Sequence, residues 1–267
     1  MQSEAYKISG FALVAGAVGF LLRWLQDIRI MNEETGLAEN APISWLVAGL
    51  MAMSAVVLAV YVLRLARYDM PEEPSEALVG KTGFYGVIAM VPAVLLALAA
   101  AYQMLRPHGL WPLMERICGG AKLLGAFGLI TIANAASNPR QKAAGRRGTY
   151  LLMLFALVWL ITAYRQAAAE PIVWRYIVEI LAQCVVTLAF FHTMGYFFDV
   201  PHTKWALFLC HMGAVLCIMC AIDDNGIAQS LSYGAMAAQL LIWGFVITEN
   251  LKTRPIVPVR PGEIPTD

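Results

Sequence analysis

Long apolar stretches limit the folds open to this chain more than any other feature of its sequence. A helix that spans a bilayer needs about 20 predominantly apolar residues, and eight segments approach that length. Backbone groups find no water in hydrocarbon, and barrel strands have only about 9 to 11 residues. We therefore predict an all-α polytopic integral membrane protein with eight transmembrane helices. Their expected ranges are 8–25, 43–63, 83–105, 117–136, 148–164, 172–198, 205–222 and 226–248.

The composition agrees with this prediction and excludes other classes. Of the 267 residues, 60% are hydrophobic and 14% are charged, against roughly 45 to 50% and 25% in soluble domains. The formal net charge is +1, and no basic patch extends beyond short loops, so nucleic acid is not an expected partner. The expected partner is the lipid bilayer. No predicted connection is long enough to hold a soluble catalytic domain.

The distribution of basic residues predicts the orientation. An excess of Lys and Arg marks the cytoplasmic side, and 12 of the 19 basic residues fall on the side with both chain ends. We therefore expect a multi-pass protein of the plasma membrane with a cytoplasmic N-terminus and C-terminus. Residues 1–252 form the predicted transmembrane domain. Residues 253–267 contain four prolines and no apolar periodicity, which predicts a disordered cytoplasmic tail.

A weak internal repeat is visible at two places. The pattern Pro-Ile-x-Trp occurs at 42–45 and at 171–174, and Asp-x-Pro occurs at 69–71 and at 199–201. The two copies are four predicted helices apart and share their orientation. This spacing indicates a parallel duplication of four helices each, a kind seen in some transporters. Chance similarity between apolar helices is the alternative.

The sixth apolar segment carries the clearest candidate site. Arg175, Glu179 and Gln183 are spaced four residues apart, which places them along one stripe of a helix. Lys122 enters the fourth segment from the same side. An ionised group at bilayer depth costs roughly 2.5 to 3.5 kcal/mol on insertion scales. These residues therefore indicate a polar cavity for a small charged or zwitterionic molecule, a proton-carrying Glu179, or an ion pair that fixes helix register.

Two histidines and a cysteine pair suggest other chemistry. His192 and His211 lie at matched depth on consecutive predicted helices, and such a pair can ligate a haem iron or a metal. Histidines that are hydrogen-bonded in a helix core give the same pattern, and no further ligands accompany this pair. We therefore predict neither a cofactor nor a metal site. Cys217 and Cys220 form a C-x-x-C pattern. Gly213 and Ala214 share their helix face, which favours close packing over redox chemistry.

Pairs of small residues indicate where helices approach closely. Ala12 and Gly16, Ala15 and Gly19, and Ala121 and Gly125 are each four residues apart. Such spacing lets helix backbones come together in a membrane. We expect these pairs to form contacts within the bundle.

Three functions are compatible with these features. The first is a small-molecule transporter or permease-like protein whose ligand binds Glu179, Arg175, Gln183 and Lys122. The second is a non-catalytic anchor, assembly or sensor subunit that contacts a partner subunit through helix faces and the basic residues 140–147. The third is a membrane oxidoreductase that uses haem or thiols. No motif of a hydrolase or an intramembrane protease occurs in the sequence.

Overall fold

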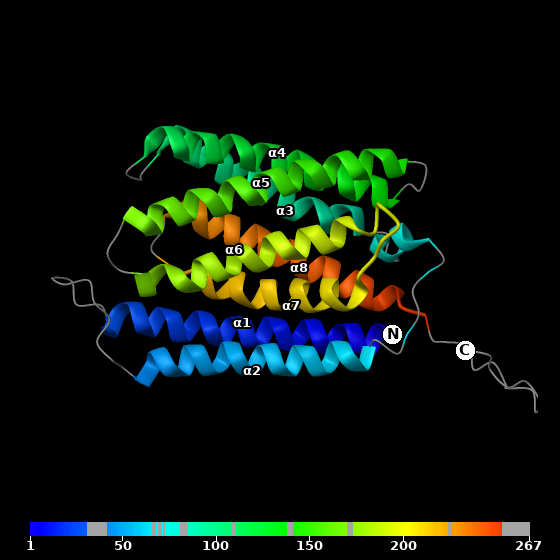
Figure 1. Cartoon of the computed structure of the whole chain (residues 1–267), viewed down its shortest axis with the longest axis horizontal. Helices are drawn as coiled ribbons and strands as arrows, with labels where there is room; N and C mark the ends of the chain where they lie inside the picture. Colours follow the sequence, from blue (N-terminus) through cyan, green and yellow to red (C-terminus); the bar gives the residue numbers. More distant parts are fainter. Residues whose placement is uncertain are drawn as a thin grey trace, which may run out of the picture.

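A computed structural model confirms the all-α class and the eight helices (Figure 1). It describes residues 1–30, 42–65, 68, 71, 73–80, 85–107, 111–137, 141–169, 173–223 and 226–252. Within these ranges the side chains of 27–30, 42, 137, 167, 169 and 173–176 are not described. The predicted tail at 253–267 lies outside the described residues. All eight helices are long and apolar enough to cross a membrane, so the chain is a multi-pass membrane protein.

The helices alternate in direction along the bundle (Figure 1). Consequently α1 begins and α8 ends on the same side, which we call the terminal side, and the other side is the opposite side. The bounds are α1 Gln2–Ile30, α2 Pro42–Leu65, the short 3-10 helix η1 Pro74–Leu78, α3 Tyr85–Leu105, α4 Pro112–Ser137, α5 Lys142–Ala169, α6 Val173–Met194, α7 Thr203–Cys220 and α8 Ile227–Asn250.

Several helices extend beyond the apolar stretches that predicted them. Helix α4 begins at Pro112 rather than at residue 117, because proline is well suited to a first helical turn. Helix α5 begins with the polar residues that follow Lys142. Helix α6 instead ends at Met194, before the predicted end at 198, and a turn follows over residues 195–199. In that turn Asp199 has a φ of 60°, a left-handed conformation that cannot continue a helix.

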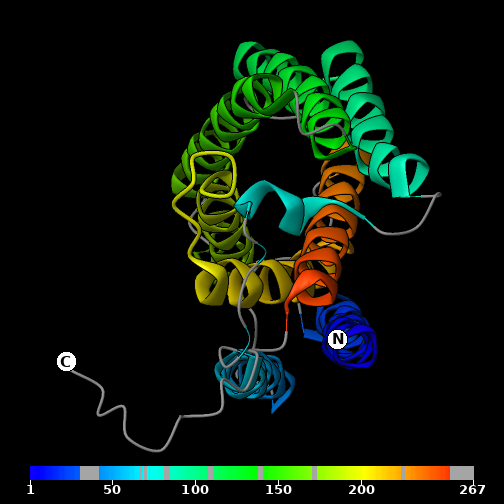
Figure 2. The ribbon, with the colours of Figure 1, turned by 90° about the vertical axis from the view of Figure 1, so that its right-hand side faces the viewer.

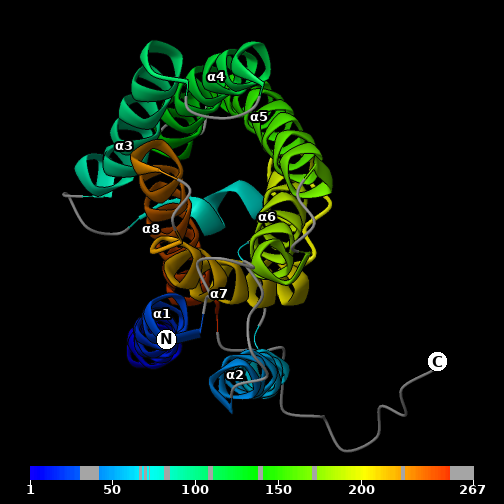
Figure 3. The same ribbon diagram turned by 90° about the vertical axis from the view of Figure 1, so that its left-hand side faces the viewer.

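Six helices form a closed ring. Each of α3 to α8 contacts the next helix in the series, and α8 returns to contact α3. Figures 2 and 3 show this ring end-on. Aromatic side chains meet across its interior: Trp159 and Tyr233 have ring centroids 5.0 Å apart, and Phe190 and Trp243 have centroids 5.7 Å apart. Aromatic side chains of α5, α6 and α8 therefore occupy part of the interior of the ring.

Helices α1 and α2 lie outside this ring. Helix α1 packs on α7 and α8, and α2 packs on α1 and α7 (Figure 3). Gly16 and Gly19 face Ile218 and Met219 of α7, and a Cβ atom on Gly16 would lie 2.8 Å from the Ile218 side chain. These small residues thus bring α1 against the bundle, as the sequence predicted.

The fold does not confirm the predicted duplication. Helix α2 begins with the first Pro-Ile-x-Trp copy and lies outside the ring, whereas α6 begins at Val173 within the second copy and is part of the ring. Residues 171 and 172 lie outside the described residues. A repeat of four helices would place α2 and α6 in equivalent surroundings. The matches are two short patterns, and chance similarity stays the alternative.

The outer faces of the helices are apolar. In α3 the buried residues Ala89, Ala93, Leu96 and Ala100 alternate with a stripe of exposed apolar residues at the same spacing. That stripe consists of Val87, Val91, Val94 and Leu98, each at least half exposed. An apolar stripe of this kind on a soluble protein would be an aggregation site. In a bilayer it meets lipid chains, which explains why it carries no polar residue.

The 3-10 helix η1 closes the terminal side of the ring. Figure 2 shows η1 crossing the mouth of the ring, where it contacts α8 and α4. Asn250, the last residue of α8, donates through Nδ2 to the carbonyl oxygens of Glu76, Ala77 and Val79 at 3.3, 3.1 and 2.8 Å. The hydroxyl of Tyr85 donates to Leu78 O at 2.9 Å. Two side chains therefore hold the backbone of this segment in place.

Replacing Asn250 should release η1. In Asn250→Leu three carbonyl oxygens lose their donor, at a cost of roughly 1 to 3 kcal/mol. We expect faster amide hydrogen exchange over residues 73–80 in detergent micelles, measured by mass spectrometry. Thr248→Val is the control, because the Thr248 hydroxyl donates only within α8, to Gly244 O. Equal exchange in the two variants would contradict the anchoring role of Asn250.

A close contact between α7 and α8 gives a second prediction. A Cβ atom on Gly244 would lie 2.6 Å from Cε1 of the buried His211 ring, whereas one on Gly234 in the same helix would meet nothing within 4 Å. Gly244→Ala should therefore lower the free energy of unfolding by about 1 to 3 kcal/mol. Gly234→Ala should leave it unchanged or raise it slightly, because alanine favours helix. Thermal unfolding followed by circular dichroism would compare the two.

Candidate functional site

Polar side chains from four ring helices meet inside the ring. We call Lys122 of α4, Trp159 of α5, Glu179 and Gln183 of α6, and Gln229 and Tyr233 of α8 the interior cluster. Lys122, Trp159 and Gln183 each lie ten residues from the helix end on the opposite side. At a rise of 1.5 Å per residue that is about 15 Å, or half of a hydrocarbon core of about 30 Å. Glu179 and Tyr233 lie six residues, and Gln229 two residues, from the same ends of their helices, so the cluster lies in the half of the ring on the opposite side.

Gln229 connects α8 to the two helices across the ring. Its Oε1 accepts a hydrogen bond from Trp159 Nε1 at 3.0 Å and a longer one from Lys122 Nζ at 3.4 Å. Lys122 is fully buried. The ionisable groups within electrostatic range of Lys122 are Cys118 and Glu115 of the same helix. A charged lysine at this depth therefore has one weak direct hydrogen bond among the described residues.

Gln183 and Glu179 form the part of the cluster contributed by α6. Gln183 Nε2 donates to the Tyr233 hydroxyl at 2.9 Å, and the Tyr233 ring lies against Trp159. Glu179 is one helical turn from Gln183 and is 5% exposed. Its carboxyl group lies within electrostatic range of Tyr233 and Arg23. Glu179 thus brings a carboxylate to the α6 side of the cluster, whereas Glu115 is the carboxylate within electrostatic range of Lys122 on the α4 side.

The structure brings together three of the four residues predicted from the sequence. Glu179, Gln183 and Lys122 are all buried in the ring. The fourth, Arg175, belongs to α6, but its side chain lies outside the described residues. Sequence reasoning missed Trp159, Gln229 and Tyr233. The four-residue spacing of Gln229 and Tyr233 was the available signal, since it places both on one face of α8.

A buried ion pair next to the cluster was also missed. Arg23 of α1 binds Asp223, just after α7, through two contacts: Nη2 to Oδ2 at 2.6 Å and Nε to Oδ1 at 3.1 Å. Both side chains are 8% exposed. This two-point geometry is the strongest form of a side-chain ion pair. It fastens α1, which lies outside the ring, to the connection between α7 and α8.

Breaking this pair should destabilise the protein strongly. Arg23→Met leaves the Asp223 carboxylate buried without its principal counterion, at a cost of about 3 to 5 kcal/mol. We expect a lower unfolding temperature in micelles, largely restored when Asp223→Leu is added. Lys7→Met at the other end of α1 is the control, since Lys7 pairs with Glu4 at the surface. Independent, additive losses in the double variant would argue against the pair.

The two candidate histidines have separate surroundings. His211 lies between Leu207 O, 2.8 Å from Nδ1, and Ser9 Oγ, 3.2 Å from Nε2. Because the carbonyl can only accept, Nδ1 carries the hydrogen and Nε2 accepts from Ser9. His192 instead packs against the rings of His202 and Trp205. Within the described residues no three His, Cys, Asp or Glu side chains group as a metal site would require.

The candidate thiols are packed inside the bundle. Cys118, Cys217 and Cys220 are at most 1% exposed, and all five cysteines are free thiols. Buried thiols of this kind normally serve packing, because redox exchange needs an accessible thiolate. The geometry therefore gives no support to the oxidoreductase hypothesis.

The basic start of α5 is engaged within the protein. Lys142 Nζ lies 2.5 Å from Asp199 Oδ1, and Arg146 Nη2 lies 3.8 Å from Asp199 Oδ2. Arg146 Nε also donates to Phe197 O at 2.9 Å. Two of the basic residues proposed to bind a partner subunit thus anchor the turn between α6 and α7 instead. Arg140 lies outside the described residues.

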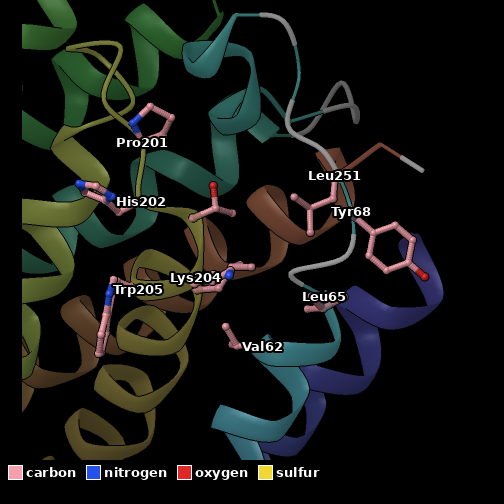
Figure 4. Close-up of a pocket in the computed structure, with 10 residues that line it drawn as sticks. Val62, Leu65, Tyr68, Pro201, His202, Lys204, Trp205 and Leu251 are labelled. Atoms are coloured by element: carbon pink, nitrogen blue, oxygen red, sulfur yellow. The ribbon is translucent and has the colours of Figure 1, made fainter. Parts of the chain in front are cut away.

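An open pocket of about 420 Å³ lies at the terminal side of the bundle. Figure 4 shows it between Val62 and Leu65 at the end of α2 and Lys204 and Trp205 at the start of α7. The other lining residues are Tyr68, Pro201, His202, Thr203, Leu207 and Leu251. The pocket shares no residue with the interior cluster. It is therefore a separate surface feature at the membrane boundary.

Comparison with known proteins leaves the site to be judged on its own geometry. No protein-family model, no curated protein and no solved structure matches the chain.

Proposed function

We propose that this protein is a transporter that carries a small polar solute through the plasma membrane by way of the interior cluster. The observation that carries the proposal is the meeting of polar side chains from four helices inside a closed ring, in its half on the opposite side. Intramembrane polar groups that face a bundle interior mark solute and ion pathways in many membrane proteins. The side chains proposed to bind the solute are those of Lys122, Gln229, Trp159, Gln183 and Tyr233. Glu179 supplies a charge nearby.

The energetic cost of the cluster supports a functional role. A ring that served only to anchor the protein could be filled with leucine and would avoid the roughly 2.5 to 3.5 kcal/mol cost of each buried charge. The buried ion pair of Arg23 with Asp223, by comparison, has the full two-point geometry of a structural contact. Among the described residues, Lys122 has one direct hydrogen bond, of 3.4 Å, to the neutral amide of Gln229, and Glu115 lies within electrostatic range. Lys122 therefore resembles a side chain that binds a solute more than one that stabilises the fold.

The layers on the terminal side of the cluster would act as the closed gate. The contact between Phe190 and Trp243 crosses the ring at 5.7 Å, seven residues beyond Gln183 along α6. Beyond it, η1 covers the mouth of the ring (Figure 2). Release of a solute on the terminal side requires both layers to move. The surplus of basic residues on that side makes it the cytoplasmic side in our proposal, with both chain ends in the cytoplasm.

Uptake into proteoliposomes tests this function. The wild-type protein is supplied with a panel of labelled amino acids, carboxylates, amines and sugars. We expect at least one solute to accumulate, and we expect Gln229→Leu to reduce its uptake roughly tenfold or more, because two donors lose their shared acceptor. Thr187→Val is the control, since the Thr187 hydroxyl donates only to the backbone oxygen of Gln183.

Two results would contradict the transporter proposal. One is that no solute in the panel crosses membranes that contain correctly inserted wild-type protein. The other is that Gln229→Leu and Thr187→Val transport equally well. Size-exclusion chromatography of each variant confirms that a loss of uptake does not come from misfolding.

A further inference from the structure

The lysine of the interior cluster has unused hydrogen-bonding capacity. An ammonium group has three N–H donors, and among the described residues Lys122 Nζ has one acceptor, Gln229 Oε1, at 3.4 Å. Its residue is fully buried. Buried charges are normally paired and hydrogen-bonded. The α4 side of the cluster is therefore complementary to a negatively charged oxygen group.

Among the described residues, Gln183 of α6 lacks a hydrogen-bond donor for its side-chain oxygen, whereas Lys122 lacks further acceptors for its N–H groups. Gln183 is 1% exposed, and its Oε1 has no hydrogen-bond partner among the described residues. Its Nε2 is already bonded to Tyr233. One turn earlier on the same helix, the carboxyl group of Glu179 adds negative charge to this side. The α6 side is therefore complementary to a positively charged donor.

Two aromatic side chains connect the two sides. Trp159 donates to the same Gln229 oxygen that Lys122 contacts, and its ring lies 5.0 Å from that of Tyr233, which binds Gln183. Aromatic faces attract cationic groups. A ligand that reached from Lys122 to Gln183 would thus pass along an aromatic surface.

We propose that the transported solute is a small zwitterion, such as an amino acid, with its carboxylate on Lys122 and its ammonium group at Gln183 and Glu179. This inference rests on the transporter function proposed above and specifies its substrate class. Lys122, with a single bond of 3.4 Å, and Gln183 Oε1, with no partner among the described residues, have opposite character and lie on two ring helices, α4 and α6, which is the polarity that a zwitterion requires. A simple anion would leave Gln183 Oε1 without a donor, and a simple cation would bring no further acceptor to Lys122.

Binding of charge-matched probes tests the inference. The purified full-length protein in micelles is dialysed against labelled glycine, β-alanine, γ-aminobutyrate, acetate and methylammonium. We expect at least one of the three zwitterions to bind about tenfold or more tightly than acetate and methylammonium, the loss expected for a missing charged hydrogen bond. Lys122→Met should weaken that zwitterion by a similar factor and leave methylammonium unchanged. Gln183→Leu should weaken the zwitterion and leave acetate unchanged.

A binding selectivity other than this preference for zwitterions would overturn the inference. Acetate bound as tightly as every zwitterion would make the site an anion site. Failure of all three zwitterions, while the uptake panel yields a solute that depends on Gln229, would refute the substrate class and keep the transporter function. Absence of any uptake refutes the function itself. Thr187→Val, next to Gln183 on α6, should behave like the wild-type protein throughout.

Discussion

Hydrocarbon offers no hydrogen bonds, and this constraint explains the main features of the fold. Every polar group in the membrane must find its partner in the protein. The chain turns the polar side chains of the interior cluster into the ring of α3 to α8 and its apolar stripes outward, as on α3. The ring has no open edge, because α8 contacts α3. The interior cluster is thus shielded from lipid on every side.

Within this interior, the polar groups differ in how well they are satisfied. Asn250 uses one amide nitrogen for three carbonyl oxygens of η1, and His211 is bonded at both ring nitrogens. These groups hold the structure together. Lys122 and Gln183 Oε1 are buried as deeply but lack comparable partners among the described residues. In our proposal this contrast separates the side chains that maintain the fold from those that bind the solute.

The sequence was sufficient for the fold class and for part of the site. Helix number follows from apolar length, because the bilayer sets a minimum span. Glu179, Gln183 and Lys122 stood out because ionisable and amide groups are rare in such spans. Trp159 and Tyr233 did not, because aromatic residues are common in any helix of this kind. Their importance comes from α5 and α8 facing each other across the ring, an arrangement that no local pattern contains. The pairing of Arg23 with Asp223 could not be predicted from the sequence for the same reason.

The pair between Arg23 and Asp223 joins residues 200 positions apart, which has a consequence for synthesis of the protein. Chains enter the membrane from the N-terminus, so α1 is inserted long before α7 and its following turn exist. During that interval Arg23 has to keep its guanidinium at the lipid headgroups, as long basic side chains near helix ends can do. The two outer helices can dock on the ring only at a late stage, when residue 223 has emerged. Assembly of this bundle therefore ends with the part of the chain that was made first.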